Sequence, residues 1–599
     1  MSVEEAEVDQ QSKDLNDDAN HPSLTEYLIK GDEQAENLKN NGFMETLKSI
    51  DILGNNKNEG NVEEKIRETN DNNKSLQLKE VSDRNDDNQQ VLERTEIPLD
   101  QGEPTGENER RQSRRSKCIS EENLAKNVLT FILFLGMVNA YFLRINIVIT
   151  IDASFRHTKL SRLRPVECVQ HQLTNNSKKL SDSPFRWTEN QRTQIVNAFF
   201  YGHCISQLPS GILVHRFGSK LMLGIGMVIN TILGFLTPIT ASYGFIYLFI
   251  LRFIQGIVIG PVIPSSYTIL ANWTPPNERS RRVAAINCGA QIGMAITMSI
   301  SKYIASNEMI GGWATMFYIS NGFNTLWLIS LYELVYEDPV SHPTLKKRCK
   351  INILSSVWGT EIPRHNVKIP WKEIFYSPPA WGITLAALAN RYGYEILLTE
   401  IPIYINDVLD FSYKKHAFFA AMPFCFMAIF AMMFSFLLDE LITHKKISIA
   451  TARKIGNTIG QIGPAIALCF VGYASCDPFL TLAILSIGLG VNGAIYSGYV
   501  ANHIDISPNY VCILVAMTTF IATGIGFIAP VLASYALYGE ITFKTWGEIF
   551  FLAIGQYIIC NLCYMVFVEG KRQPWDTKIP WISIEEVDRA LSVYGRIRR

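Results

Sequence analysis

About twelve runs of roughly 20 predominantly apolar residues follow residue 125, and this repetition constrains the fold more than any other feature. An α-helix needs a run of that length to cross the hydrocarbon core of a bilayer. Inside lipid every backbone polar group must be satisfied within the protein, so such a chain folds as a bundle of transmembrane helices. The sequence therefore predicts an all-α membrane protein, with helices starting near residues 126, 191, 221, 245, 283, 313, 379, 417, 457, 478, 511 and 547.

Residues 1–124 differ sharply from the rest of the chain. They are rich in Asp, Glu, Asn, Gln and Lys and poor in aromatic and β-branched residues, so we predict a disordered cytosolic tail. The polar start MSVEEAEVDQ does not resemble a cleavable signal peptide. The longest polar break follows the sixth run and divides the runs into six and six. The expected parts after the tail are an N-terminal bundle (125–337), a cytosolic central loop (338–376), a C-terminal bundle (377–568) and a cytosolic tail (569–599).

The basic residues predict the orientation. With twelve spans and a cytosolic amino terminus, all four basic clusters fall on one side, as the positive-inside rule requires. These clusters are Arg110–Lys117, Arg279–Arg282, Lys346–Lys350 and His444–Lys454. The loop 152–190 then lies on the opposite side, where the sequon at Asn175 is available for glycosylation. Most of the 11 cysteines fall in helices and are interpreted as small core residues, with a disulfide between Cys168 and Cys476 as a less favoured alternative.

Three arginines interrupt the apolar runs. Arg144, Arg252 and Arg391 lie in the first, fourth and seventh predicted helices. A charge at the centre of a membrane helix costs roughly 2.5–3.5 kcal/mol on insertion scales, so such residues indicate a functional site. In a chain of two six-helix bundles the first and seventh helices are pseudo-symmetric partners around a midplane site. Arg144 and Arg391 could therefore clamp a carboxylate or phosphate between two planar forks of donors.

Each arginine also has a purely structural interpretation. Arg391 and Glu395 are four residues apart on one helix face and could simply pair with each other. Arg252 could bond to the backbone and to polar neighbours between helices instead of taking part in coupling. His203, in the second predicted helix, could be a polar side chain hydrogen-bonded between helices or a proton carrier.

Two short motifs narrow the class of protein. The segment 211–220, GILVHRFGSK, resembles the loop signature of the major facilitator superfamily, with His215 where that signature has an acid. The fourth helix carries Arg252, Gln255 and Gly256 at a spacing similar to that superfamily's fourth-helix motif. Gly256 and Gly260 lie one turn apart, so a neighbouring helix can approach closely.

Longer segments resemble the anion-transporter family that contains sialin, the vesicular glutamate transporters, the type I sodium–phosphate cotransporters and the insect inorganic phosphate cotransporters. The resemblance covers about 126–576 and implies a twelve-helix major facilitator fold of two six-helix bundles. It also implies an anion carrier driven by sodium, protons or membrane potential. The segments that carry it are FRWTENQRTQIVNAFFYGHCISQLPSGILVHRFGSK, NWTPPNERSRR, LLTEIPIY, NHIDISPNY and GKRQPW.

The resemblance also implies site residues. Arg144 matches the first-helix arginine of the family's anion site, Arg252 the fourth-helix arginine, and Arg391 the seventh-helix arginine of the vesicular glutamate transporters. Ile259 stands where proton-coupled members have a glutamate, so proton coupling through that acid is not expected. Glu395 and His203 are the candidate substitutes for coupling or gating. Two further departures are Val196 and Thr519, where vesicular glutamate transporters have a histidine and an asparagine.

The sequence thus predicts a secondary active transporter of a small anion, inorganic phosphate or an organic carboxylate, in a plasma membrane or an endolysosomal or vesicular membrane. Sodium or protons are the expected coupling ions, and no other cofactor and no nucleic-acid partner is expected. We find no sequence motif of a nucleotide-binding loop, a metal cluster or a nucleophile–base pair, so an enzyme is not expected. Two alternatives remain: a transport-incompetent receptor or scaffold that uses the acidic tail, and an uncoupled anion conductance.

Overall fold

The structure is a computed structural model that describes residues 106–154, 187–305, 312–359, 361–363, 368–396, 417–471, 477–536, 543–577 and 581–597. The chain divides into two compact units, Met1–Lys117 with Glu585–Arg599, and Cys118–Ile584. The second unit contains the helices that match the apolar runs. Asn175, the proposed pair Cys168 and Cys476, and most of the tail (1–105) lie outside the described residues.

Each of the twelve predicted runs coincides with helical residues in the described part of the chain. The run that starts near 245 is broken at Gly260 and Pro261, and the run that starts near 478 passes through a short 3-10 turn. The N-terminal half contains α5 (Gly106–Ser154), α6 (Glu189–Phe217), α7 (Ser219–Tyr243), α8 (Phe245–Ile259), α9 (Val262–Trp273), η1 (Pro276–Glu278), α10 (Arg279–Ala305) and α11 (Gly312–Leu334). The C-terminal half contains α14 (Pro378–Glu395), α16 (Ala417–Thr443), α17 (Ile449–Val471), α18 (Pro478–Asn492), η6 (Gly493–Ser497), α19 (Tyr499–Ile506), α20 (Val511–Ala536) and α21 (Phe543–Phe567).

The central loop and the carboxyl segment are also structured. The loop contains η3 (Pro339–Ser341), α12 (Lys347–Trp358), β1 (Glu361–Pro363) and α13 (Trp371–Phe375). After α21 come α22 (Pro574–Thr577), β2 (Trp581–Ser583) and α23 (Ile584–Ile597), and β1 pairs with β2 in antiparallel register.

One predicted boundary differs from the structure. Helix α5 begins at Gly106, within the segment that the sequence assigns to the disordered tail. Residues 106–124 are polar but rich in Arg, Glu and Gln, which are good helix formers. High polarity argues against a buried core, and it does not by itself prevent a helix.

Among the described residues, seven segments are long and apolar enough to cross a membrane, judged by length and composition. Helices α6 and α14, which match the polar second and seventh runs, are not among them, and neither are α11, α17 and α20. The fifth run, which carries Gln291, does qualify. The seven are Ser116–Ile147, Ser219–Tyr243, Phe245–Trp273, Pro276–Ile300, Ala421–Thr443, Phe479–Ile506 and Trp546–Phe567.

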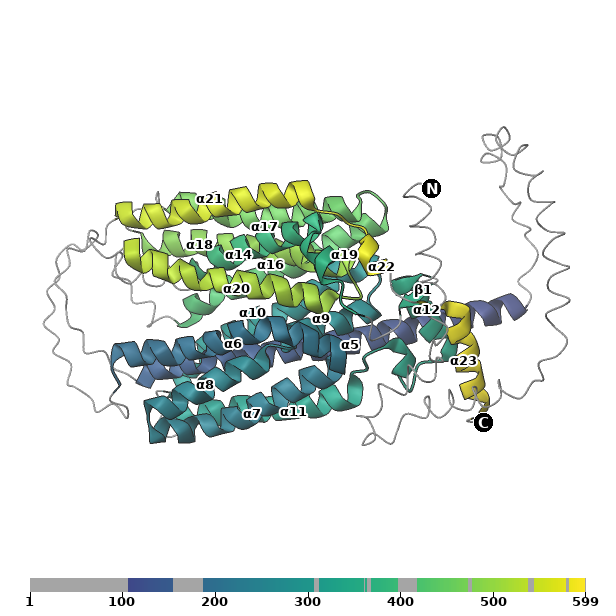
Figure 1. Ribbon diagram of the computed structural model, residues 1–599, viewed down its shortest axis with the longest axis horizontal. Helices are drawn as coiled ribbons and strands as arrows, with labels where there is room; N and C mark the ends of the chain where they lie inside the picture. The colour runs from purple at the N-terminus through teal and green to yellow at the C-terminus, as the bar shows by residue number, and fades with distance from the viewer. Residues whose placement is uncertain are drawn as a thin grey trace, which may run out of the picture. The chain divides into compact units, whose positions relative to one another are not determined.

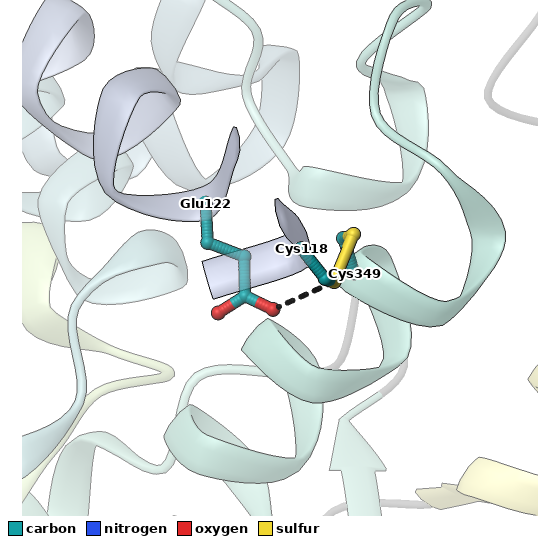
Figure 2. A group of neighbouring side chains, drawn as sticks. All are labelled: Cys118, Glu122 and Cys349. Atoms are coloured by element: carbon teal, nitrogen blue, oxygen red, sulfur yellow. Dashed lines mark hydrogen bonds between the residues drawn. A yellow bond between two sulfur atoms is a disulfide. The ribbon is translucent and has the colours of Figure 1, made fainter. Parts of the chain in front are cut away.

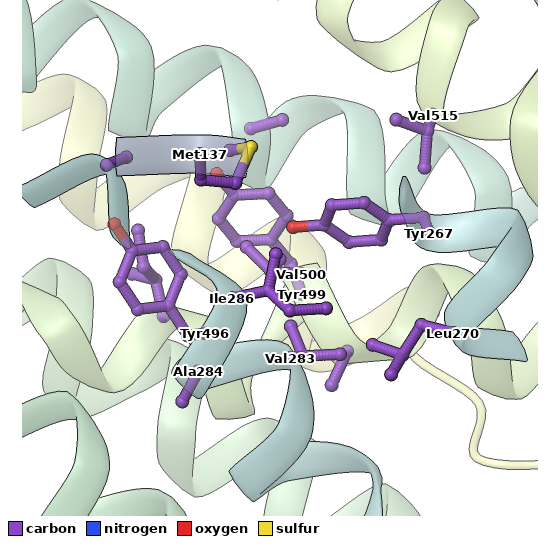
Figure 3. Close-up of a cluster of buried hydrophobic side chains, with 14 of the residues drawn as sticks. Met137, Tyr267, Leu270, Val283, Ala284, Ile286, Tyr496, Tyr499, Val500 and Val515 are labelled. Atoms are coloured by element: carbon purple, nitrogen blue, oxygen red, sulfur yellow. The ribbon is translucent and has the colours of Figure 1, made fainter. Parts of the chain in front are cut away.

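The two halves lie side by side and meet along several helices (Figure 1). Helix α10 packs against α16, while α6 and α9 pack against α20. Buried side chains from both halves form one continuous core, in which Met137 of α5 and Tyr267 of α9 lie with Tyr496 and Tyr499 of the C-terminal half (Figure 3). Several tyrosines, each carrying a hydroxyl group, therefore lie at the junction of the two bundles.

Two of the segments that resemble the anion-transporter family are hydrogen-bonded to each other beyond the end of α21. Asp576 is fully buried and accepts hydrogen bonds from the Ser507 hydroxyl (2.8 Å) and the Asn509 side-chain amide (3.1 Å). The backbone amide of Gln573 donates to the Ile506 carbonyl (2.9 Å). The segment NHIDISPNY thus packs against GKRQPW and the Asp576 that follows it. These contacts hold α19 and the start of α20 near the end of α21.

Glycines allow α6 and α8 to approach closely, as the sequence predicts. A Cβ atom at Gly256 would collide with the carbonyl oxygen of Phe199, and one at Gly260 would collide with the Ser206 hydroxyl. The backbones therefore pack in contact, which is the usual role of small residues between membrane helices.

We expect Gly256→Val to lower the free energy of unfolding by about 1–3 kcal/mol, because the added methyl groups would force the two helices apart. The measurement is the thermal unfolding midpoint of the detergent-solubilised protein. Gly322→Val is the matched control, because a Cβ atom there meets no heavy atom within 4 Å. Equal shifts for the two variants would contradict the packing argument.

Candidate functional site

Arg144 lies on α5 among aromatic rings. Its guanidinium carbon is 4.7 Å from the centroid of the Phe200 ring, 5.4 Å from that of Tyr141 and 5.7 Å from that of Phe199. The side chain is only half-buried. Aromatic faces stabilise a cation without neutralising its charge, so the Arg144 guanidinium keeps its capacity to bind an anion.

Arg252 is held in place by its neighbours on both sides. It is buried, and it donates to the Gln255 side-chain oxygen (2.9 Å) and to the backbone carbonyl of Arg144 (3.1 Å). Its guanidinium carbon also lies 4.8 Å from the centroid of the Phe199 ring. Arg252 therefore ties α8 to the segment of α5 that presents Arg144, which is the structural interpretation offered for this residue from sequence.

Arg391 and Glu395 form an ion pair along one face of α14. About 24% of the Arg391 side chain and 10% of the Glu395 side chain stay accessible, so the pair is not sealed into the core. Both residues interact electrostatically with Arg144 across the junction of the bundles. The structure therefore brings three guanidinium groups and one carboxylate into the same region.

His203 belongs to the same region through a chain of hydrogen bonds. Its imidazole Nε2 lies 2.8 Å from the Gln207 side-chain nitrogen, and the Gln207 oxygen accepts from the Thr519 hydroxyl (2.7 Å). His203 also interacts electrostatically with Arg144 and Arg391. This chain links α6 of one bundle to α20 of the other, and Thr519 contributes at a position singled out as a departure from the family pattern.

Gln291 makes a second polar connection between the halves. Its amide nitrogen donates to the Tyr496 hydroxyl (2.7 Å), and its oxygen accepts from the Tyr394 hydroxyl (3.4 Å). Gln291 lies on α10, whereas Tyr394 and Tyr496 lie on α14 and η6. Neutral hydroxyl and amide groups therefore also connect the two halves at the bundle junction.

Three of the basic clusters converge at one end of the bundle, which we call the basic end: Arg279–Arg282, Lys346–Lys350 and His444–Lys454. Arg282 donates to the Lys126 carbonyl at the start of the α5 span (3.0 Å), and Lys346 pairs with Glu121 (2.8 Å). Arg453 donates to the Ser280 hydroxyl (2.7 Å). The expectation that these clusters share one side is consistent with these contacts.

A buried ion network joins the two bundles at the basic end. Asp505 of α19 pairs with Arg279 of α10 (2.9 Å) and with Arg453 of α17 (2.5 Å). Asp439 of α16 accepts from the backbone amides of Ser280 (3.2 Å) and Arg281 (2.8 Å). Because Arg279 and Ser280 belong to the N-terminal half and the two aspartates to the C-terminal half, this network connects the two bundles at the basic end.

This network is not predicted from the sequence, in which Arg279 indicates only the orientation and Asp505 stands inside the NHIDISPNY segment. A usable signal was present, because Asp439, Arg453 and Asp505 are charges at or within apolar runs, as the three noted arginines are. Their partners are distant in sequence, so pairing could not be deduced from spacing.

Residues 129–530 match the sequence profile of the Major Facilitator Superfamily, which covers more than half of the chain. The chain belongs to the Major Facilitator Superfamily. Its fold also resembles that of the proton:xylose symporter XylE, with a TM-score of 0.56 over 79% of this chain and 100% of that one. The sequence identity to XylE is 16%, so this likeness concerns the fold alone.

Relatives within the superfamily identify the branch. The chain is 40% identical to a Drosophila melanogaster protein named "Putative inorganic phosphate cotransporter", over 75% of this chain and 85% of that protein. It is 31% identical to sheep sialin, over 76% of this chain and 91% of sialin, and 28% identical to a vesicular glutamate transporter of Xenopus tropicalis, over 66% and 68%. The chain is therefore a multi-pass membrane protein of the sodium/anion cotransporter family, as the resemblance predicts.

Proposed function

We propose that this protein is a secondary active transporter of a small anion, either inorganic phosphate or an organic carboxylate, that works by alternating access. The observation that carries the proposal is the meeting of Arg144, Arg252 and Arg391 at the bundle junction, where among the described residues Glu395 is the carboxylate that interacts with them. The excess of positive charge suits a substrate that brings negative charge with it. The names of the relatives, a putative inorganic phosphate cotransporter, sialin and a vesicular glutamate transporter, support the same substrate class.

In this proposal Arg144 and Arg391 bind the anion, and Arg252 positions Arg144. Arg391 is paired with Glu395 in the structure, so an incoming anion competes with Glu395 for the guanidinium group. A planar guanidinium offers five donors, so Arg391 can bind the incoming anion before its contact with Glu395 has fully broken. Glu395 thus takes the place of the substrate on Arg391 until an anion binds.

We further propose that the basic end is cytosolic, as the positive-inside rule indicates, and that both termini are cytosolic. Opening toward the cytosol then requires the ion pair of Asp505 with Arg279 to separate, and with it the hydrogen bonds that Asp439 accepts from two backbone amides. Asn175 would lie on the opposite side and carry a glycan. A mobility shift on glycosidase treatment that is lost in Asn175→Gln would support this orientation.

Coupling to sodium or protons must use a residue other than the one expected from proton-coupled relatives, because Ile259 is apolar and buried. Glu395 and His203 are the proposed substitutes, since both interact with the arginines. No other cofactor is needed in this proposal.

The test is uptake of labelled phosphate, glutamate and sialic acid into proteoliposomes under imposed sodium or proton gradients. Accumulation of one anion that follows one gradient would establish a coupled carrier and its driving ion. The replacement of the expected acid by Ile259 is the observation that favours a transport-incompetent receptor. Folded protein that moves none of these anions would favour that alternative, and electrical current without dependence on either gradient would favour an uncoupled conductance.

Glu395→Gln separates the two roles open to this residue. If Glu395 carries the coupling ion, we expect gradient-driven accumulation to fall about tenfold, whereas exchange of labelled for unlabelled substrate continues, because exchange needs no net ion movement. Glu440→Gln is the matched control. Glu440 is an exposed acid at the basic end, and among the described residues its carboxylate pairs only with His444. Loss of exchange and accumulation together would instead show that Glu395 acts as the structural partner of Arg391.

A further inference from the structure

Two cysteines distant in sequence are joined at the basic end. Cys118, at the start of the α5 span, and Cys349, in the first turn of α12, form a disulfide that closes a sequence separation of 231 residues. Their Cα atoms are 5.6 Å apart, within the range that disulfides span without backbone movement. Both side chains are buried. Seven other cysteines among the described residues are unpaired, so close approach of sulfur atoms is specific to this pair.

Polar groups surround the two sulfur atoms. The Glu122 carboxylate lies 3.4 Å from the Cys118 sulfur, and Figure 2 shows it directed at the sulfur pair. The Asn352 amide lies 3.8 Å from the same sulfur, and the Glu121 carboxylate lies 3.8 Å from the Cys349 sulfur. These groups come from both α5 and α12, so the two helices are fitted to each other around the pair.

The location of the pair determines its resting chemistry. In the orientation proposed above it faces the cytosol, where glutathione and thioredoxin keep thiols reduced. A structural disulfide is unusual there, whereas a reversible one is typical of redox sensing. Cationic residues flank Cys349 in the sequence at positions 346, 347, 348 and 350, and Lys346 pairs with the Glu121 carboxylate that lies beside the Cys349 sulfur, which offsets the charge of that carboxylate.

Helix α12 contacts elements of both halves. Besides the sulfur pair, Lys346 just before the helix pairs with Glu121 of α5 (2.8 Å), and α12 packs against α9. At its other end, the Trp358 ring lies 5.5 Å from the guanidinium carbon of Arg572, which follows the last helix of the C-terminal half. A covalent bond between Cys118 and Cys349 therefore fixes one end of α12 to α5. Helix α12 contacts both halves at the basic end, which has to open during transport.

We propose that Cys118 and Cys349 form a reversible thiol–disulfide site whose oxidation slows opening of the basic end and hence slows transport. Hydrogen peroxide is the class of oxidant: two thiols and one peroxide give one S–S bond and two waters. A dithiol reductant reverses the bond by thiol–disulfide exchange and is itself oxidised to a disulfide. The effect on transport rests on the function proposed above, but formation of the bond does not.

A metal site is the competing use of the same residues. Ligand atoms of Cys118, Glu122 and Cys349 lie within 4.8 Å of one another, and thiolates with a carboxylate suit Zn²⁺. Structural zinc sites take four protein ligands, however, and the nearby Glu121 is already paired with Lys346. The flanking cations also oppose the binding of a divalent cation. The arrangement therefore favours the disulfide.

The experiment uses the full chain in proteoliposomes, treated with hydrogen peroxide or with dithiothreitol. Free thiols are then blocked, and the peptides are mapped by mass spectrometry, while exchange of labelled phosphate is measured on the same samples. The variants are Cys118→Ser and Cys349→Ser, with Cys469→Ser as the matched control, because Cys469 is exposed and unpaired. Zinc content of the reduced protein is measured in parallel.

After peroxide treatment we expect a linked peptide that contains positions 118 and 349. We also expect exchange to be about fivefold slower, a change at the lower end of typical coupling between sites. Dithiothreitol should restore exchange fully. Both serine variants should lose the linked peptide and the peroxide response, whereas Cys469→Ser should keep them. Three results would overturn the proposal: no linked peptide, a linked peptide with unchanged exchange, or stoichiometric zinc that disappears in Cys118→Ser. If the linked peptide forms in protein that exchanges no anion under any condition, the proposed transport function fails while the redox chemistry stands.

Discussion

Arg144→Ala is expected to reduce uptake of the transported anion by about a hundredfold, because it removes charge-assisted hydrogen bonds that are together worth about 3 kcal/mol. The loss should be visible in both accumulation and exchange, since both require the anion to bind. Aromatic rings hold the Arg144 guanidinium, and among the described residues no ion pair neutralises it, so its removal takes away an uncompensated cation of the junction. Labelled uptake into proteoliposomes of matched protein content is the measurement.

Two further variants make this result specific. Arg144→Lys keeps the charge but loses the planar fork, so we expect an intermediate loss of uptake. Arg348→Ala removes an exposed arginine of α12 and should leave uptake within about twofold of the wild type, as exposed charges contribute little. Wild-type uptake by folded Arg144→Ala protein would exclude Arg144 from the anion site.

Asp505→Ala is expected to lower the free energy of unfolding by about 3–5 kcal/mol, because it takes the carboxylate partner away from two buried arginines. Arg453 is fully buried and Arg279 nearly so, and Asp505 contributes one oxygen to each of them. The same change removes an ion pair between the bundles, so the basic end should open more readily. Thermal unfolding in detergent measures the first effect, and alkylation of cysteines placed behind the network measures the second.

The matched control for stability is Glu333→Ala, which removes an exposed acid of α11. Replacing Asp505 by leucine and Arg453 by methionine together should recover part of the lost stability, because the partner charge then leaves with the carboxylate. A shift for Asp505→Ala no larger than that for Glu333→Ala would show that the network does not stabilise the folded protein.

Much of the architecture could be predicted from the sequence because lipid leaves few alternatives. A run of about 20 apolar residues has to be helical inside a bilayer, so the twelve starting positions and the six-plus-six division follow from composition. The start of α5 at Gly106 was not predicted, since charged residues that form good helices give no hydropathy signal. The structured central loop was missed for the same reason.

The candidate site could be predicted only residue by residue. Each of Arg144, Arg252 and Arg391 is conspicuous because a charge in an apolar run is costly, and the pairing of Arg391 with Glu395 follows from helical spacing. The chain from His203 through Gln207 to Thr519 could not be deduced, because it joins helices more than 300 residues apart in sequence. The disulfide between Cys118 and Cys349 could not be predicted for the same reason, since spacing carries no information about which helices meet at the basic end.

Counterflow tests the central claim of an alternating-access carrier most directly, because it requires no knowledge of the coupling ion. Proteoliposomes are loaded with unlabelled phosphate, and in parallel with glutamate or sialic acid, and are diluted into a trace of the same labelled anion without any ion gradient. A carrier predicts that the label rises transiently above its equilibrium level, only with internal substrate and only with Arg144 present. Entry that is the same with and without internal substrate, or no entry of any of the three anions into liposomes with folded protein, would contradict it.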